Sequence, residues 1–367
     1  MTRAGREPVT AGHLGMWLAV TFGLCMITGL ISHGIQHPPG WFHWPSRPVN
    51  LYRVTQGVHV ISGIAAIPLL AAKLWSVAPK LFERPVVRSL PHLLERLSLL
   101  VLVTSASFEL LTGLFNIAQN YPWNFYFPQV HFAVGWIAVG SLLLHAAVKI
   151  PVFRRALGEP REPAAQRGPG RLVSRRGFLG VTALSVGTAV TVTAGMTVPW
   201  LREVAVLGTR SRLGAQGLPV NRTAAAAGVL DSAQDTGWRL EVRGPRGVRT
   251  FSLPELESFT QFTAELPIAC VEGWSQQAVW SGVRLADVLR AVGAPADAQV
   301  RVSSLEAAGP YSSSVVAPTH AADPLTLLAL RLGGEPLHPD HGFPCRLIAP
   351  NRPGVMQTKW LRRVEVL

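Results

Sequence analysis

Charged residues are scarce in this chain of 367 residues, and acidic residues are the scarcest. Asp, Glu, Lys and Arg make up 15% of the sequence, whereas soluble domains carry about 25%. The first 200 residues hold 17 Lys and Arg, six Glu and no Asp. This composition argues against a wholly soluble protein, and the 48% of hydrophobic residues excludes a disordered chain.

Cysteine is almost absent, with three residues in the whole chain. Three thiols cannot build a disulfide scaffold, a multi-cysteine zinc site or an iron–sulfur cluster with four cysteine ligands. The basic excess lies among apolar segments, where it favours membrane orientation over nucleic-acid binding. We therefore expect a membrane protein whose partner is the lipid bilayer, and we expect no binding of nucleic acid.

Long apolar stretches occupy the first 200 residues. Each approaches or reaches the ~20 residues that a helix needs to cross ~30 Å of hydrocarbon. They run over Leu14–Ile31, Val54–Val77, Leu93–Ala118, Val130–Ile150 and Phe178–Trp200. The sequence predicts an all-α bundle of four transmembrane helices within residues 1–150, and a fifth transmembrane helix over 178–200 that tethers the C-terminal residues to the membrane.

Basic residues orient these helices. They gather between the second and third stretches and between the fourth and fifth, so the positive-inside rule places the N-terminus in the cytoplasm and the residues after Trp200 outside. Residues 151–177 read as a basic cytoplasmic linker. The sequence Ser-Arg-Arg-Gly-Phe-Leu at 174–179 spans the junction of this linker with the fifth helix. This matches the twin-arginine export pattern, with an ordinary basic helix flank as the alternative. We expect an uncut helix and a multi-pass protein of the plasma membrane.

Four histidines lie along the apolar stretches, where ionisable groups are costly and usually functional. His131 and His145 are 14 residues apart on one helix, which separates them by ~21 Å within ~40° of one face. The predicted orientation places His59 at the same membrane surface as His131, and His13 at the same surface as His145. Two imidazoles fill both axial positions of a haem iron, which favours electron transfer. We predict an outer haem on His59 and His131 and an inner haem on His13 and His145, unless some of these are interfacial or capping residues.

This arrangement over about residues 10–150 resembles the di-haem cytochrome b subunits of respiratory formate dehydrogenases and nickel–iron hydrogenases. The resemblance implies two b haems that connect a quinone site in the membrane to a redox enzyme outside. Glu109, deep in the third stretch, is open to two interpretations. It relays protons to or from a quinone, or it is a hydrogen-bonded structural group.

From Leu201 onward the composition is that of a soluble domain, long enough to hold its own core. Strand-like runs outnumber helical ones, so we expect a mixed α+β extracytoplasmic domain over 201–367. The expected strands include Trp238–Val242, Val248–Phe251, Val300–Val302 and Leu361–Val366. The expected helices are Pro254–Phe259, Leu285–Val292 and Pro324–Leu330.

A series of ordered motifs runs through this domain. Cys-Val-Glu-Gly-Trp-Ser at 270–275 is followed by Trp-Ser-Gly-Val at 280–283, Gly-Gly-Glu-Pro-Leu at 333–337 and His-Gly-Phe-Pro-Cys-Arg-Leu at 341–347. Over about residues 235–367 these motifs resemble the molybdenum-binding domain of the sulfite oxidase superfamily. The first motif is most similar to the periplasmic methionine sulfoxide reductase branch.

The resemblance assigns roles to individual residues. It implies that Cys270 is the one protein ligand of molybdenum, beside a pyranopterin dithiolene. A thiolate is a soft ligand suited to such a metal. A lone cysteine without this motif would instead be interpreted as a buried packing residue. Gly354 and Lys359 match the loop that helps to hold the pterin phosphate. Arg346 is either a further cofactor contact or the partner of a carboxylate. The segment Leu218–Thr223 stands where a second pterin-binding segment is expected.

Together these parts predict a molybdopterin-dependent oxidoreductase. Quinol would be oxidised in the membrane, electrons would pass through two haems, and molybdenum outside would reduce a small S-oxide or N-oxide. One alternative is the reverse direction, with a substrate oxidised outside and quinone reduced. A second is a haemless membrane anchor served by a soluble donor. A third is a binding module without molybdenum, against which the presence of Cys270 argues.

Overall fold

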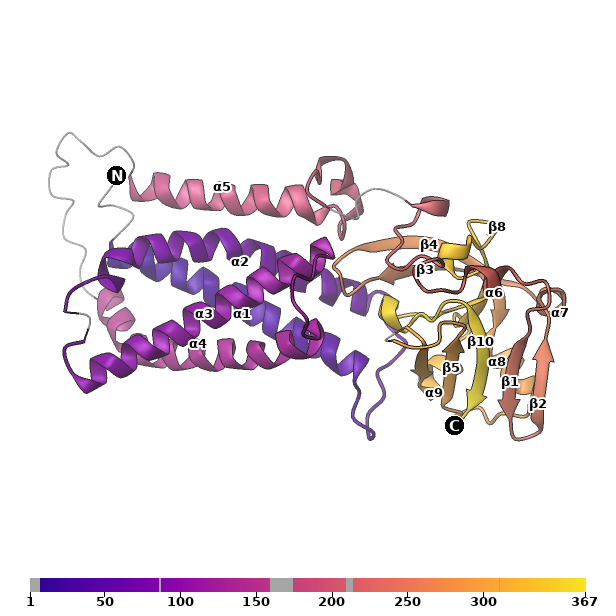
Figure 1. Cartoon of the computed structure of the whole chain (residues 1–367). Coiled ribbons are helices and arrows are strands. Elements are labelled where there is room, and N and C mark those ends of the chain that lie inside the picture. Colours follow the sequence, from indigo (N-terminus) through magenta and orange to yellow (C-terminus); the bar gives the residue numbers. More distant parts are fainter. Residues whose placement is uncertain (1–6, 86, 159–173, 209–213, 310) are drawn as a thin grey trace. The chain divides into compact units, whose positions relative to one another are not determined.

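The computed structural model describes residues 7–85, 87–158, 174–208, 214–309 and 311–367 (Figure 1). The chain divides into two compact units. The first consists of Met1–Gly29 with Val58–Ala194, and the second of Leu30–Gly57 with Gly195–Leu367. Most of the predicted basic linker, residues 159–173, lies outside the described residues.

Long helices make up the first unit and extend into the second. They are α1 (Pro8–Gln36), α2 (Leu51–Leu81), α3 (Leu90–Ala118), α4 (Phe127–Gly158) and α5 (Arg175–Ala194). All five are long and apolar enough to cross a membrane, and only 6% to 33% of the most apolar window of each is buried inside the protein. Exposed apolar faces of this size need a non-aqueous surrounding. The helices therefore indicate a multi-pass membrane protein.

The fifth helix packs against the others. Phe178 and Leu179 of α5 lie against a buried cluster formed by α1 and α2, which includes Leu14 and Leu69. The Phe178 ring also stacks on Trp75 with a centroid distance of 5.0 Å. The first turn of α5 carries the two arginines of the predicted export pattern, so this packing holds the helix at the end of that pattern.

The expected end of the fifth helix at Trp200 is wrong, because α5 ends at Ala194 and a 3₁₀ helix spans Pro199–Val204. Proline has no backbone N–H and disfavours helical geometry in the residue before it, and Val198 is accordingly extended. At Gly195 a Cβ would lie 2.6 Å from the Leu201 carbonyl oxygen. Glycine thus permits the chain to fold back sharply after α5.

Two five-stranded sheets form the second unit within the described residues. One sheet has the order β2-β1-β10-β5-β6, with β1 and β10 parallel and the other pairs antiparallel. The other has the order β3-β4-β7-β8, and β9 also pairs with β7. The strands are β1 (Leu240–Gly244), β2 (Gly247–Phe251), β3 (Phe262–Ala269), β4 (Ser275–Arg284), β5 (Val300–Ser304), β6 (Ser313–Val316), β7 (Leu327–Leu332), β8 (Glu335–Pro336), β9 (Arg346–Ile348) and β10 (Leu361–Val366). These strands confirm the mixed α+β expectation and, within two residues, all four strands named from the sequence.

Short helices complete the second unit: α6 (Leu230–Gln234), α7 (Leu253–Ser258), α8 (Leu285–Ala291) and α9 (Pro318–Ala321). The first sheet buries its core against α8, whose Leu285 and Val288 pack with Val242 and Val302. The second sheet has a smaller core around Trp280, which is fully buried. Helices α7 and α8 confirm two predicted helices within one residue.

The helix expected over Pro324–Leu330 is wrong, because Leu327–Leu332 forms the strand β7. The run Leu-Leu-Ala-Leu-Arg-Leu favours a helix by propensity. In the fold it lies between β4 and β9, and five of its six side chains are buried. A strand covered on both faces loses the alternation that distinguishes it from a short helix. Gly333 and Gly334, both at positive φ, then turn the chain into β8.

Candidate functional site

Cys270 occupies a tight turn between β3 and β4. Its backbone N–H donates to the Trp274 carbonyl at 2.8 Å, and its own carbonyl accepts from the Gly273 N–H at 3.1 Å. Gly273 has a φ of 91°, a conformation that glycine adopts without strain. The side chain of Cys270 is 1% exposed. The hairpin therefore holds a single thiol in a fixed position at the end of a sheet.

The C-terminal loop lies against this hairpin. Ala269 forms an isolated parallel bridge with Pro353. A Cβ at Gly354 would lie 3.1 Å from the Ala269 carbonyl oxygen and 3.6 Å from the Cys270 Cα, so glycine permits the close approach. Gly354, predicted as a cofactor residue, thus positions the loop beside the thiol through its backbone.

Arg346 begins β9 and is 1% exposed. Its guanidinium donates to the carbonyls of His341 and Gln357 at 3.0 and 3.1 Å and lies over the Trp280 ring. Within the described residues it makes no ion pair, and its Nε has no hydrogen-bond partner. Burial lowers the pKa of Arg346 to about 9. A buried cation of this kind is costly unless an anion compensates it. This position therefore does not match the alternative of an arginine paired with a carboxylate.

Lys359 adds a second cation to the same cavity. Its ammonium donates to the carbonyls of Arg222 and Asp340 at 2.7 and 2.8 Å. Burial, followed by the charge of Arg346, lowers the pKa of Lys359 to about 7. Arg222 pairs with the buried Glu306 at 2.8 Å, and its Nε has no hydrogen-bond partner within the described residues. The cavity is therefore electropositive and would bind an anion.

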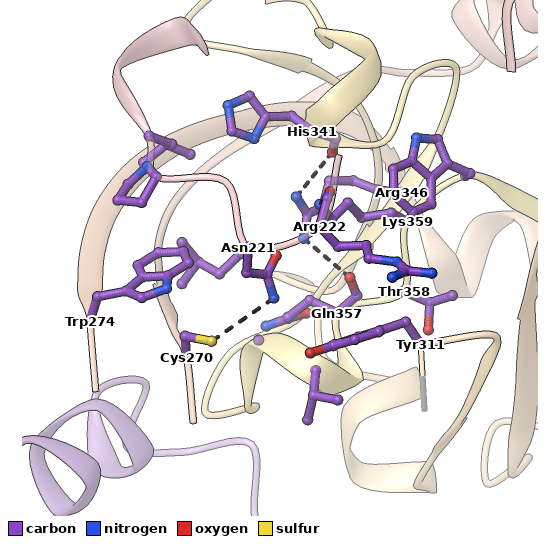
Figure 2. Close-up of a pocket in the computed structure, with 16 residues that line it drawn as sticks. Asn221, Arg222, Cys270, Trp274, Tyr311, His341, Arg346, Gln357, Thr358 and Lys359 are labelled. Atoms are coloured by element: carbon purple, nitrogen blue, oxygen red, sulfur yellow. Dashed lines mark hydrogen bonds between the residues drawn. The ribbon is translucent and has the colours of Figure 1, made fainter. Parts of the chain in front are cut away.

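These groups line one cavity of the second unit. Figure 2 shows the Asn221 amide pointing toward the Cys270 sulfur, and their N···S distance is 3.9 Å. Trp274 and Tyr311 complete the wall. One thiol ligand, two buried cations and the two guanidinium nitrogens left without partners among the described residues form a donor set that fits a thiolate-bound metal with an anionic organic cofactor.

Several lining residues carried no sequence motif of their own. Four of them come from the segment 218–223: Leu218, Pro219, Asn221 and Arg222. The position of this segment in the chain was the only feature of the sequence that indicated a role in the site. Tyr311 lies in a loop with no recognisable pattern. Cys345, the cysteine of the motif at 341–347, is fully buried in the core of the first sheet, and burial raises its thiol pKa.

The two histidines predicted to share the outer haem lie close together in the first unit. The ring centroids of His59 and His131 are 6.3 Å apart and the rings are inclined at 75°. The Nδ1 of His59 donates to the Cys25 carbonyl at 2.9 Å, and the Nδ1 of His131 is 3.2 Å from the Thr112 hydroxyl. Glu109 joins this group, with its carboxylate 3.2 Å from the Nε2 of His131.

The predicted inner pair is not brought together in this way. The His13 Nδ1 donates to the Val9 carbonyl one turn earlier in α1 at 2.8 Å, and His145 is half-buried on α4. Lys73 of α2 approaches the same end of α1, where its ammonium donates to the Ala11 carbonyl at 2.6 Å. No ring contact between His13 and His145 occurs within the described residues.

Known proteins resemble part of this chain. Residues 227–367 match the family model described as the oxidoreductase molybdopterin binding domain. The chain is 32% identical over 132 residues to the uncharacterised oxidoreductase YuiH of Bacillus subtilis, covering 35% of this chain and 65% of that one. It is 32% identical over 155 residues to the mitochondrial sulfite oxidase of Drosophila melanogaster, covering 35% of this chain and 27% of the enzyme.

A third relative is YedZ1 of Azospira oryzae, provisionally named as a protein-methionine-sulfoxide reductase subunit. It is 35% identical over 130 residues, covering 35% of this chain and 48% of that subunit. The chain thus spans 65% or less of the length of each of these three relatives. The C-terminal part, residues 227–367, is therefore similar to the molybdopterin-binding oxidoreductase domains of the sulfite oxidase type.

Proposed function

We propose that the chain is a membrane-bound oxidoreductase that passes electrons from quinol through two b haems to an extracytoplasmic molybdenum site. There an S-oxide or N-oxide is reduced. Quinol oxidation yields two electrons and two protons. Reduction of a sulfoxide to a sulfide consumes two electrons and two protons and releases water, so the two half-reactions balance. The observation that carries this proposal is the pair of neighbouring imidazoles in the same chain as the cationic thiol pocket.

At the C-terminal pocket the chain's own residues bind and orient the cofactor. Bound molybdopterin would supply two-electron oxygen-atom transfer. Cys270 offers the thiolate, and Asn221 donates toward its sulfur. Arg346 and Lys359 would balance the negative charge of the cofactor, since neither is compensated by a carboxylate partner of its own in the described residues. This charge match supports molybdopterin as the resident group.

In the bundle, the geometry of the outer pair supports iron ligation. Metal–imidazole nitrogen distances are about 2 Å, so two imidazoles on opposite sides of one ion have centroids about 6 Å apart. The His59–His131 separation of 6.3 Å agrees with this arrangement. In both rings Nδ1 is already engaged, as in metal-ligating histidines whose second nitrogen fixes the ring orientation. A bound haem would supply one-electron transfer.

Room for a porphyrin is a further requirement. A Cβ at Gly29 would lie 3.2 Å from the Cε1 of His59, and one at Gly113 would lie 3.9 Å from the Cε1 of His131. Both glycines therefore keep bulk away from the candidate ligands. His13 and His145 remain the predicted ligands of the inner haem. This prediction rests on the 14-residue spacing of His131 and His145 and on the predicted orientation of the helices, which places His13 at the same membrane surface as His145.

The direction of electron flow and the location rest on separate arguments. The name of the YedZ1 relative favours sulfoxide reduction. The twin arginines at the start of α5 and the basic loops favour an extracytoplasmic molybdenum domain. The protein would therefore act at the plasma membrane, with quinone and a small oxidised substrate as its partners.

Purified protein tests this proposal directly. We expect one molybdenum and two haems per chain by metal analysis and pyridine haemochrome assay. A quinol analogue should reduce the haems, and methionine sulfoxide or trimethylamine N-oxide should reoxidise them. If no haem is found, the alternative of a haemless membrane anchor is favoured. If no S-oxide or N-oxide reoxidises the haems, the proposal that the protein reduces such substrates is contradicted.

A further inference from the structure

The turn that holds Cys270 is contacted from outside by two segments distant in sequence. Within the second compact unit, the Gln56 side-chain amide donates to the Val271 carbonyl at 3.2 Å. The Thr197 hydroxyl donates to the Gly273 carbonyl, and the Ser275 N–H donates to the Met196 carbonyl at 2.8 Å. The residues on both sides of the thiol are therefore held by the start of α2 and by the segment after α5.

The start of α2 is itself fixed to the C-terminal domain by Asn351. The Asn351 side-chain oxygen accepts from the Tyr52 N–H at 2.8 Å, and so caps the first turn of the helix. Its side-chain nitrogen donates to the Pro45 carbonyl at 2.7 Å, and its own N–H donates to the Val49 carbonyl at 3.1 Å. One residue thus anchors three points of the α1–α2 connection, which we define as Leu30–Gly57.

Other contacts show that this attachment is extensive. Arg47 makes a bidentate ion pair with the buried Asp323, with N···O distances of 3.0 and 3.1 Å. Tyr52 is 1% exposed and packs with Ala269, directly before the thiol residue. Bidentate pairs to a buried carboxylate are among the stronger polar contacts in proteins. The α1–α2 connection is therefore an integral part of the domain that holds Cys270.

Gln56 is the polar residue at the centre of this contact. It is 6% exposed, and burying an amide is costly unless it is hydrogen-bonded. Its partner carbonyl belongs to the residue after Cys270. In the sequence His59, a proposed haem ligand, follows Gln56 by three residues in the same helix. The same helix thus carries both a contact to the thiol turn and a candidate haem ligand.

We propose that the Gln56–Val271 hydrogen bond is the contact through which electrons pass between α2 and the Cys270 turn. This inference rests on the proposed function. A ferrous haem held by His59 would supply one electron at a time and would become ferric. Gln56 and Val271 would carry each electron from α2 to Cys270, the residue that would hold molybdenum. Two such transfers supply the two electrons that reduction of one sulfoxide consumes.

Two nearly isosteric substitutions separate this role from simple support of the turn. Gln56→Leu removes the amide donor on the helix that carries His59. Thr197→Val removes a donor to the same turn from a segment that carries no haem ligand. Each variant, as full-length holoprotein, is reduced with a quinol analogue and mixed with methionine sulfoxide in a stopped-flow instrument. The rate of haem reoxidation is compared with sulfoxide reduction driven by reduced benzyl viologen, which bypasses the haems.

We expect Gln56→Leu to slow haem reoxidation at least tenfold while viologen-driven turnover per molybdenum stays within twofold of the wild type. Thr197→Val should leave the rate of haem reoxidation within twofold. Hydrogen exchange of the segment 269–275, measured on the holoprotein, should increase in both variants because each loses a contact to that turn. These results together would support the proposal.

Three outcomes would overturn it. Equal slowing by both variants, or equal loss of haem-driven and viologen-driven turnover in Gln56→Leu, would reduce Gln56 to structural support. Unchanged exchange in Gln56→Leu would show that the contact does not form. If the haems of the wild-type protein are never reoxidised, the proposed function fails and this inference fails with it. If they are reoxidised normally and Gln56→Leu has no effect on the rate, only this inference is contradicted.

Discussion

The pocket around Cys270 and the His59–His131 pair are built in opposite ways. The pocket gathers residues from several loops, and backbone hydrogen bonds and close glycine contacts hold them in place. The histidine pair lies on α2 and α4, and the regular spacing of helical residues decides which side chains meet. Helical spacing can be counted along a sequence, whereas a loop pocket can be anticipated only from motifs in a known order.

The first prediction tests the centre of the pocket and has the largest expected effect. Cys270→Ser replaces the sulfur that is the proposed ligand of molybdenum by a harder oxygen. Even changes outside the ligand shell of a metal cost about 10–100-fold, so we expect viologen-driven sulfoxide reduction to fall by roughly 100-fold or more. The haem content should be unchanged. Turnover assays with molybdenum and haem analysis measure both effects.

Cys345→Ala serves as the matched control for that substitution. Cys345 is also fully buried, but it packs in the core of the first sheet. We expect this variant to lose stability and to keep its molybdenum. If Cys270→Ser retained metal and turnover, or if Cys345→Ala lost its molybdenum while still folded, the assignment of the ligand would be wrong.

A second prediction concerns the histidine pair. His131→Ala should lower haem from about two to about one per chain, because the proposed outer haem would lose one of its two imidazole ligands. Viologen-driven turnover at molybdenum should persist. His92→Ala on α3, a histidine outside the predicted set, should retain both haems. Pyridine haemochrome assays measure this, and an unchanged haem content in His131→Ala would remove the outer site.

Gly354 provides a smaller test of the pocket. In Gly354→Ala the added methyl would lie 3.1 Å from the Ala269 carbonyl oxygen, so the loop must move away from the thiol. Overpacking of this kind costs about 1–3 kcal/mol of stability. We expect a lower midpoint in thermal unfolding and partial loss of molybdenum. Gly40→Ala, where the methyl would meet no atom within 4 Å, should change neither measurement.

The smallest effect is a pH dependence. In the chain without cofactor, burial holds the pKa of Lys359 at about 7, below its ordinary value of 10.5. Between these values the unfolded chain binds more protons than the folded chain, so stability increases with pH by up to about 1 kcal/mol per pH unit. We therefore expect the thermal unfolding temperature of the cofactor-free protein to increase when the pH is raised from 7 to 9. In Lys359→Met this slope should become smaller, and an identical slope would contradict the assignment.

Much of the fold could be anticipated from the sequence. Apolar length identified the five long helices, and alternation identified strands such as β10. The strand β7 was not predicted, because both of its faces are buried and the alternation of apolar and polar residues is therefore lost. The early end of α5 depends on Pro199 and on the sharp fold after Gly195, which a sliding apolar window does not register.

The candidate site was only partly predictable. Cys270, Gly354 and Lys359 belong to ordered motifs, and all three line the cavity. Asn221 and Tyr311 reach it from loops whose course depends on the packing of the whole domain. No pattern in the sequence indicated that the α1–α2 connection would belong to the second unit. Its attachment depends on single side chains such as Asn351, whose partners lie about 300 positions away.

Asn351 also bears on any attempt to divide this protein. A polypeptide that began at residue 201 would look like an intact soluble domain by composition. It would lack the backbone groups that satisfy Asn351 and the guanidinium that pairs with the buried Asp323. The turn that holds Cys270 would also lose its hydrogen bond from Gln56. The α1–α2 connection is thus part of the C-terminal domain, and separating the two by protease or by gene truncation should damage the domain that remains.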